Sequence, residues 1–128
     1  MYDSLDVFQT AAAMAKHAGA RQALVARNIA NADTPGYKAE HIAAFKEAYE
    51  GHPAASMRTT RSGHMGGQSH HSASREVVAT TSEPSPNGNT VSIEDELLNS
   101  VAVSREHSRA LTIYRHSMTV LRTSLGQA

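Results

Sequence analysis

Two long stretches without proline, residues 3–32 and 93–125, place apolar side chains at alternating intervals of three and four. This spacing puts the apolar residues on one face of an α-helix, so each stretch predicts one amphipathic helix. The spacing also approaches the 3.5-residue repeat with which helices wind around one another. We therefore expect an all-α fold in which the two long terminal helices pack as a helical hairpin, in the manner of a coiled coil, around a largely disordered or irregular middle segment. The candidate helix-packing residues are Leu5, Phe8, Val25, Ile29, Leu97, Val101, Leu111, Tyr114, Met118, Leu121 and Leu125.

The ends of both helices carry residues with defined positional preferences. Pro35 lacks an amide hydrogen and disfavours the helical conformation in the residue before it, so the first helix is expected to end near residues 31–34. Ser92 suits the N-cap of the second helix, with Asp95 three residues later in an approximate capping box. The acidic residues 94–96 also complement the positive end of that helix dipole.

The chain between the helices changes character twice. Ile42 is followed by aromatic residues at i+3 and i+7, which predicts a short helix over Glu40–Glu50. Residues 51–90 are dominated by Ser, Thr, Gly, His and Pro, and they bury too little apolar surface to offset the entropy of ordering. We expect an exposed, largely disordered insertion with a short strand at Glu76–Thr80. The expected units are 1–37 (N-terminal helix and turn), 38–50 (short helix), 51–91 (flexible Gly/Ser/His-rich insertion) and 92–128 (C-terminal helix).

Charge and cysteine content exclude several classes of protein. Twelve Lys and Arg balance twelve Asp and Glu, so no basic surface for nucleic acid is expected. The chain has no cysteine, which excludes disulfides, thiolate metal sites and Cys nucleophiles. Its longest apolar run, residues 11–15, is far shorter than the ~20 residues of a membrane-spanning helix, and the acidic start is unlike a signal peptide. We expect no membrane insertion and no cleavable signal peptide. The Ala-rich core is thin, and the zero net charge allows self-association.

The most specific segment is Asn-Ile-Ala-Asn-Ala-Asp-Thr-Pro-Gly-Tyr, residues 28–37. Pro35 presets φ for the second position of a type II turn, and Gly36 accepts the positive φ of the third. The amides of Asn28 and Asn31 project from one helix face, where they suit holding a turn or a neighbouring backbone. On composition alone the segment is also compatible with a simple helix stop. The candidate turn and assembly residues are Asn28, Ile29, Asn31, Thr34, Pro35, Gly36 and Tyr37.

This segment resembles the N-terminal signature of the axial proteins of the bacterial flagellum, which are the rod, hook and hook-associated subunits. Residues 87–96, Asn-Gly-Asn-Thr-Val-Ser-Ile-Glu-Asp-Glu, resemble a segment of the short rod subunits that precedes their C-terminal helix. Residues 58–65 match the same group more weakly. With 128 residues, the chain is most similar to the proximal rod proteins of the FlgB type.

The resemblance implies a non-enzymatic structural subunit of the flagellar basal-body rod, located in the periplasm and acting in motility. It implies export through the flagellar type III apparatus and helical assembly with copies of itself, with other rod subunits and with basal-body ring or adaptor proteins. The alternative within the same resemblance is another axial or rod subunit. It implies no cofactor.

A cluster of histidines is the main competing signal. His64, His70 and His71, with His52 nearby, are candidate ligands for a divalent metal through their neutral imidazoles. Their spacing matches no recognised site, and no carboxylate is interleaved, so a solvated loop without metal is the favoured interpretation. A His-rich metal-binding helical module remains the alternative.

The other polar residues give little support to catalysis. No Gly-x-Ser-x-Gly elbow is present, and no paired carboxylates lie in a context that would form a cleft. His17, His107 and His116 fall within the predicted helices, where we expect them on solvated faces or at subunit contacts.

Deletion of residues 64–72 tests whether the histidine cluster has a role. If the insertion is inert, export and rod formation should be unchanged, because neither helix loses a residue. Swimming of the deletion strain and calorimetry of the purified chain with Zn²⁺ or Ni²⁺ would measure this. A non-motile deletion strain, or tight stoichiometric metal binding, would favour the metal-binding alternative.

Overall fold

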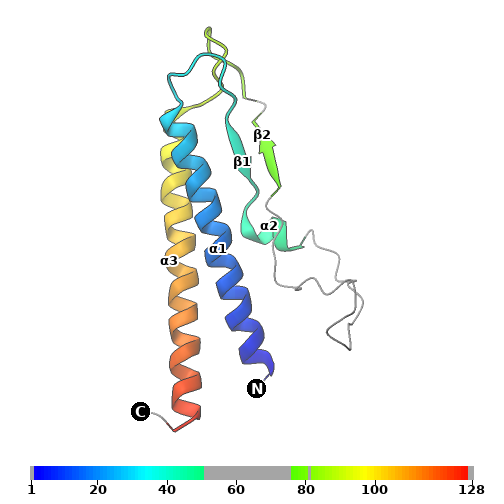
Figure 1. Cartoon of the computed structure of the whole chain (residues 1–128), viewed down its shortest axis with the longest axis vertical. Coiled ribbons are helices and arrows are strands. Elements are labelled where there is room, and N and C mark those ends of the chain that lie inside the picture. The colour runs from blue at the N-terminus through cyan, green and yellow to red at the C-terminus, as the bar shows by residue number, and fades with distance from the viewer. Residues whose placement is uncertain (1, 51–75, 81, 127–128) are drawn as a thin grey trace, which may run out of the picture.

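The structure is a computed structural model of the chain that describes residues 2–50, 76–80 and 82–126. Its elements, in order, are helix α1 (Tyr2–Ala30), strand β1 (Glu40–Ile42), helix α2 (Phe45–Glu50), strand β2 (Val77–Ala79) and helix α3 (Ile93–Ser124). The two long helices lie side by side, while β1 and α2 pack along α1 and β2 pairs with β1 (Figure 1). The expected mostly helical fold with two packed terminal helices is confirmed, and the small sheet is an addition to it.

Helices α1 and α3 run antiparallel, as their contacts show from one end of the hairpin to the other. Near one end, Asn28 of α1 donates a hydrogen bond to Glu96 of α3 at 3.0 Å. Toward the middle, Arg21 pairs with Glu106 at 2.7 Å. Near the other end, the rings of Phe8 and Tyr114 lie 4.2 Å apart. The pairing therefore continues along nearly the whole of both helices.

Small residues at intervals of seven form much of the seam between the two helices. Ala11, Ala18 and Val25 are buried at this interval in α1, and Glu96, Val103 and Ala110 are buried at the same interval in α3. A seven-residue interval keeps the same face of a helix toward its neighbour. Because alanine contributes little apolar area, this seam contributes less hydrophobic free energy than one built of leucine. The expectation of a thin core agrees with this seam.

The first half of α3 is rotated relative to the sequence-based prediction. Leu97 and Val101 were expected on the packing face, yet they are 55% and 52% exposed, and Leu125 near the C-terminus is 77% exposed. The physical reason is the buried hydrogen bond between Asn28 and Glu96, which turns residue 96 rather than residue 97 toward α1.

The remaining predicted packing residues lie closer to the seam. Val25 is buried, and Phe8 and Ile29 of α1 are half-buried. In the second half of α3, four residues are half-buried on the side of Tyr114 that meets Phe8. They are Leu111, Tyr114, Met118 and Leu121. The side chain of Leu5 lies outside the described residues.

The segment after the turn is only partly helical, in contrast to the prediction of a helix over Glu40–Glu50. Residues Glu40–Ile42 form β1, and the helix begins at Phe45. β1 pairs antiparallel with β2, with His41 opposite Val78. The strand near Glu76–Thr80 was expected, and β2 is found there.

Helix α2 is attached to α1 through aromatic contacts. The ring of Phe45 meets His17 of α1 edge-on at 5.6 Å and stacks on Tyr49 at 5.5 Å. His17 is only 2% exposed, so its expected place on a solvated face or subunit contact is wrong. His107 is half-buried and His116 is exposed.

The expected flexible insertion over residues 51–91 is described only at residues 76–80 and 82–91. Residues 51–75, which include the histidine cluster and residues 58–65, lie outside the described residues. Residues 82–91 have a defined course, and Asn89 and Thr90 are buried at 2% and 6% exposure. Ser92 caps α3 as expected, since its side chain accepts a hydrogen bond from the Asp95 amide. No described helix combines the length and hydropathy that crossing a membrane requires.

Matched truncations at Val103 and Val101 test the rotation of α3. Val103→Ala should lower the free energy of unfolding by about 2 kcal/mol, because it leaves a cavity at a fully buried position. Val101→Ala should change it by less than about 0.5 kcal/mol, because Val101 is exposed. Urea unfolding followed by circular dichroism measures both. A larger loss of unfolding free energy for Val101→Ala than for Val103→Ala would contradict the rotation and favour packing through Leu97 and Val101.

Candidate functional site

The candidate site is the junction at one end of the hairpin, where the chain leaves α1 and later enters α3. Its first part is a β-turn over residues 34–37. The Tyr37 amide donates to the Thr34 carbonyl at 3.3 Å, and Gly36 has φ +72°. A turn with proline second and a positive φ third is type II, as predicted. A side chain at position 36 would meet no atom within 4 Å, so the backbone conformation alone requires glycine there.

The second part, residues 87–90, pairs with this turn through its backbone. The Gly36 amide donates to the Asn87 carbonyl at 3.0 Å, and the Thr90 amide donates to the Tyr37 carbonyl at 3.1 Å. A Cβ at Gly88 would lie at an ordinary contact distance, 3.4 Å, from the Gly36 Cα, but Gly88 has φ +81°, so the backbone conformation favours glycine at this position too. The two sequence motifs, more than fifty residues apart, therefore meet in space. We call this contact the joint.

Asn89 connects the second segment to the end of α1. Its buried side-chain Nδ2 lies 2.9, 2.8 and 2.8 Å from the carbonyl oxygens of residues 31, 32 and 34, respectively. Carbonyl groups at and just beyond a helix C-terminus lack partners within the helix. The two N–H groups of this amide are shared among the three carbonyls, of which those of residues 31 and 34 also accept from backbone amides of the turn. The Oδ1 of Asn89 accepts from the Val91 amide at 2.7 Å. The side chain thus uses both its donor and its acceptor on main-chain groups.

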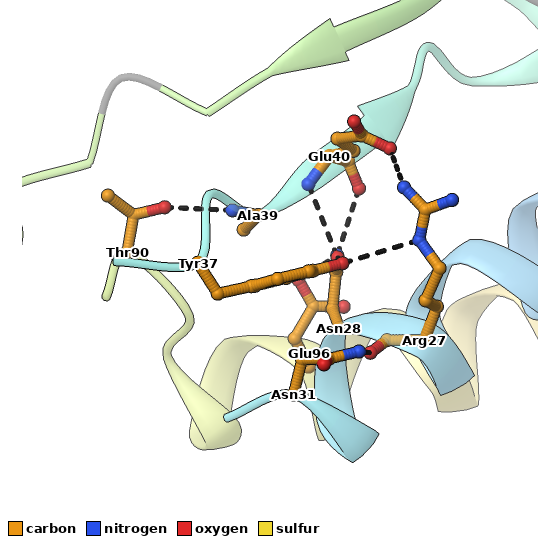
Figure 2. A network of polar contacts seen from close by, with 8 residues as sticks. All are labelled: Arg27, Asn28, Asn31, Tyr37, Ala39, Glu40, Thr90 and Glu96. Carbon is orange, nitrogen blue, oxygen red and sulfur yellow. Dashed lines mark hydrogen bonds and ion pairs between the residues drawn. The ribbon is translucent and has the colours of Figure 1, made fainter. Parts of the chain in front are cut away.

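Asn28 connects α1 to β1 and α3 (Figure 2). Its Oδ1 accepts from the Glu40 amide at 3.2 Å, and its Nδ2 donates to the Glu40 carbonyl at 2.9 Å. The same Nδ2 donates to Glu96 Oε1 of α3 at 3.0 Å. Because Asn28 is fully buried, these contacts satisfy an amide that would otherwise be costly to bury. They also explain why residue 40 is extended rather than helical.

Thr90 holds the start of β1 from the other side. Its Oγ1 accepts from the Ala39 amide at 2.8 Å (Figure 2). The Ala39 carbonyl accepts from the Thr80 amide at 2.8 Å. Ala39 is 1% exposed. The residues that lead into β1 are therefore fixed by partners from both sides of the sequence.

A partly exposed pair of charges borders the joint. Arg27 of α1 pairs with Glu40, and its Nε donates to the Tyr37 hydroxyl at 3.3 Å. The hydrogen bond to Tyr37, followed by the charge of Glu40, raises the pKa of the Arg27 guanidinium. Tyr37 in turn donates to Asn28 Oδ1 at 3.2 Å. Tyr37 therefore anchors the turn to α1.

A buried carboxylate lies at the centre of the joint. Glu96 is 2% exposed, and its Oε1 accepts from Asn28 and lies 3.6 Å from the Nε2 of His41. In the described part of the chain, its Oε2 is buried without a hydrogen-bond partner. From the sequence, Glu96 was expected only to complement the helix dipole. Its burial and its long-range partner carry no local sequence signal.

The other predicted turn residues contribute locally. Asn31 Nδ2 donates to the Arg27 carbonyl at 2.8 Å, and Thr34 donates to Asn31 Oδ1 at 3.2 Å. Pro35 is exposed, and Ile29 is half-buried on α1. The sequence marked Asn87–Glu96 as a motif but did not single out Asn89 and Thr90 as candidate site residues. Asn89 lies in an Asn-Gly-Asn turn, which is a signal that could have found it.

The chemistry of the joint is that of a structural connection. Its amides, hydroxyls and carboxylates bind main-chain groups or one another. Among the described residues, no group of three or more His, Cys, Asp or Glu is placed to hold a metal ion. The candidate metal ligands His52, His64, His70 and His71 lie outside that part of the chain, so their role stays a prediction.

Asn89→Asp tests the joint with a nearly isosteric change. The new carboxylate would face three carbonyl oxygens and lose both donors, which should lower the free energy of unfolding by about 3 kcal/mol. Asn87→Asp is the matched control, since Oδ1 of the exposed Asn87 only accepts from the Asn89 amide, and a carboxylate can do the same. Its expected effect is within about 0.5 kcal/mol. Equal losses of unfolding free energy for the two variants, measured by urea unfolding, would contradict this role of Asn89.

Comparison with known proteins bears on the same end of the molecule. Residues 8–38 match the model of a family described as flagella basal body rod protein. The match covers most of α1 and the whole type II turn, which is one side of the joint. A search of curated proteins found no match. The matched segment is thus similar to that of flagellar basal body rod proteins, a family of structural components rather than enzymes.

Proposed function

We propose that this chain is a proximal rod subunit of the FlgB type, which assembles helically with copies of itself and with other axial proteins in the periplasmic part of the basal body. The observation that carries the proposal is the joint. It unites the rod-family turn with the second segment, residues 87–96, whose sequence resembles the short rod subunits. This combination favours a short rod subunit over a longer axial protein.

A rod subunit must resist bending between its helices, because the rod transmits torque. The joint supplies this resistance at one end of the hairpin. Asn89 holds the end of α1, and Asn28 holds α3 through the buried Glu96. The turn also fixes the direction in which the chain leaves the helix pair toward β1. The geometry therefore suits a rigid unit that presents its long helices to neighbouring molecules.

The surface of α3 carries exposed apolar side chains that are suited to such contacts. Among the described residues, seven large apolar side chains of α3 or its C-cap are at least 37% exposed. Contiguous exposed apolar surface is typical of protein–protein interfaces. The exposed residues are Ile93, Leu97, Leu98, Val101, Ile113, Val120 and Leu125. Zero net charge adds no long-range repulsion between copies.

The small apolar area buried in the seam suits the export route that we propose. A subunit that passes through the flagellar type III apparatus has to cross it unfolded, and a low free energy of unfolding favours this. Among the described residues of α1, the buried apolar side chains are two alanines and one valine. Assembly would then supply the stability that the single subunit lacks, since contacts that only folded subunits make stabilise the folded state. Ring and adaptor proteins at the base of the rod are the other proposed partners.

Localisation in isolated basal bodies tests the proposal. Cells lacking this chain should be non-motile and have no completed rod, and a tagged copy that restores motility should label the proximal end of the rod. Labelling farther along the rod would assign the chain to another axial subunit. A deletion strain that swims normally would contradict a role in the rod altogether.

A further inference from the structure

The pair Asn87 and Gly88 contains a chemically labile side-chain amide. In an asparagine, the backbone nitrogen of the following residue can attack the side-chain Cγ and close a succinimide ring. Glycine in the following position favours this attack, because it has no side chain to obstruct the nitrogen and it allows the widest range of backbone angles. Asn87 is the one asparagine of the sequence that precedes a glycine. The other asparagines precede larger residues, whose side chains crowd the nitrogen.

The folded joint holds the groups that this reaction uses. The Gly88 nitrogen, which is the attacking atom, donates its hydrogen to the Ser85 carbonyl at 2.7 Å. The Oδ1 of Asn87 accepts from the Asn89 amide at 3.0 Å, which fixes the rotation of the side chain. The main-chain carbonyl of Asn87 accepts from the Gly36 amide at 3.0 Å. The attacking nitrogen, the attacked side chain and the backbone between them are therefore all held by other residues.

Burial does not protect Asn87, so its hydrogen bonds have to. The side chain of Asn87 is exposed, whereas Asn28 and Asn89 are buried at 0% and 2% exposure. Water therefore reaches the reactive amide in the folded chain. A reaction that needs a local opening proceeds in proportion to the population of the open form. The reaction rate at Asn87 thus depends on how often the joint opens.

We propose that Asn87 is a site of spontaneous deamidation, and that closure of the joint suppresses the reaction. The Gly88 nitrogen forms a bond to the Asn87 Cγ, and its proton leaves with the side-chain nitrogen as ammonia. One water molecule then opens the succinimide on either side of the ring nitrogen. Cleavage of the bond to Cγ gives aspartate, and cleavage of the bond to the main-chain carbonyl carbon gives isoaspartate. This inference does not depend on the proposed rod function.

The two products affect the joint differently. Aspartate leaves the main chain intact, and its carboxylate can accept from the Asn89 amide as Oδ1 does in the unmodified chain. Isoaspartate directs the main chain through the Cβ and Cγ of residue 87, which adds one methylene group to the backbone. The carbonyl that accepts from Gly36 then becomes part of a pendant carboxylate. The added length displaces Gly88 and Asn89 from their partners, so isoaspartate prevents closure of the joint.

Deamidation of the full chain in its folded and unfolded states tests the proposal. The purified chain is incubated in mildly alkaline buffer, with and without urea above the unfolding midpoint, and peptide mass spectrometry follows each asparagine. In urea we expect Asn87 to react several times faster than Asn31 and Asn99. In buffer the reaction at Asn87 should slow by at least about tenfold, which corresponds to a free energy of joint opening of about 1.4 kcal/mol.

Two matched variants separate the joint from the rest of the fold. Thr90→Val removes the hydroxyl that accepts from the Ala39 amide, and it leaves Asn87 and Gly88 unchanged. It should raise the deamidation rate at Asn87 several-fold in buffer and leave the rate in urea unchanged. Thr119→Val is the control, because the hydroxyl of this exposed residue donates to a carbonyl within α3, far from the joint. It should change neither rate.

The effect of isoaspartate is measured on chains that were deamidated in urea and returned to buffer. Chromatography separates the two products, and isoaspartyl methyltransferase labels the isoaspartate fraction. Hydrogen exchange at the Gly36 amide should lose its protection in that fraction. Protection should persist in the aspartate fraction and in Asn87→Asp. Equal protection in both fractions would overturn the effect of isoaspartate on the joint.

Three further results would overturn the proposal. Equal rates at Asn87 in buffer and in urea, for a chain whose circular dichroism in buffer shows both helices, would exclude suppression by the joint. A rate in urea no higher than at Asn31 and Asn99 would exclude Asn87 as the preferred site. A folded Thr90→Val chain that deamidates no faster than the unmodified chain would exclude control by the joint. If Thr90→Val does not fold, the comparison of buffer with urea in the unmodified chain still decides.

Discussion

Two buried asparagines must satisfy their side-chain amides, and the rest of the molecule is arranged around this requirement. A buried amide without partners would cost a few kcal/mol, a large share of the stability of a small domain. Asn28 uses its amide on the backbone of residue 40 and on Glu96, while Asn89 uses its amide on the carbonyls at the end of α1. Each side chain thereby ties together segments that are far apart in the sequence.

The same contacts determine which apolar surface remains for other molecules. Because Glu96 faces α1, the neighbouring leucines of α3 face outward, and the seam is left to small residues such as Ala18 and Ala110. A hairpin of this kind is weak in its own core and rich in exposed apolar surface. Both properties suit the proposed role as a subunit of the flagellar basal body rod. The joint provides rigidity that the thin seam does not.

Local sequence signals predicted much of the fold. The two helices, the Ser92 cap, the turn at Pro35 and Gly36 and the strand near residue 78 follow from spacing or from the preferences of single residues. The rotation of α3 could not be predicted, since a stripe through Leu97 and Val101 is as periodic as the buried one. The extended conformation of residues 40–42 and the roles of Asn89 and Glu96 depend on partners many residues away. Contacts between residues far apart in the chain produce no periodic pattern in a single sequence.

The turn after α1 and the segment before α3 form one joint with the stability of the helix seam. Hydrogen exchange of the backbone amides of Gly36, Ala39 and Thr90 measures this most directly, because each donates across the joint. We expect these amides to be protected to the same degree as the amides at the centre of α1 and α3. Exchange at the rate of an open loop, while both helices stay protected, would contradict it.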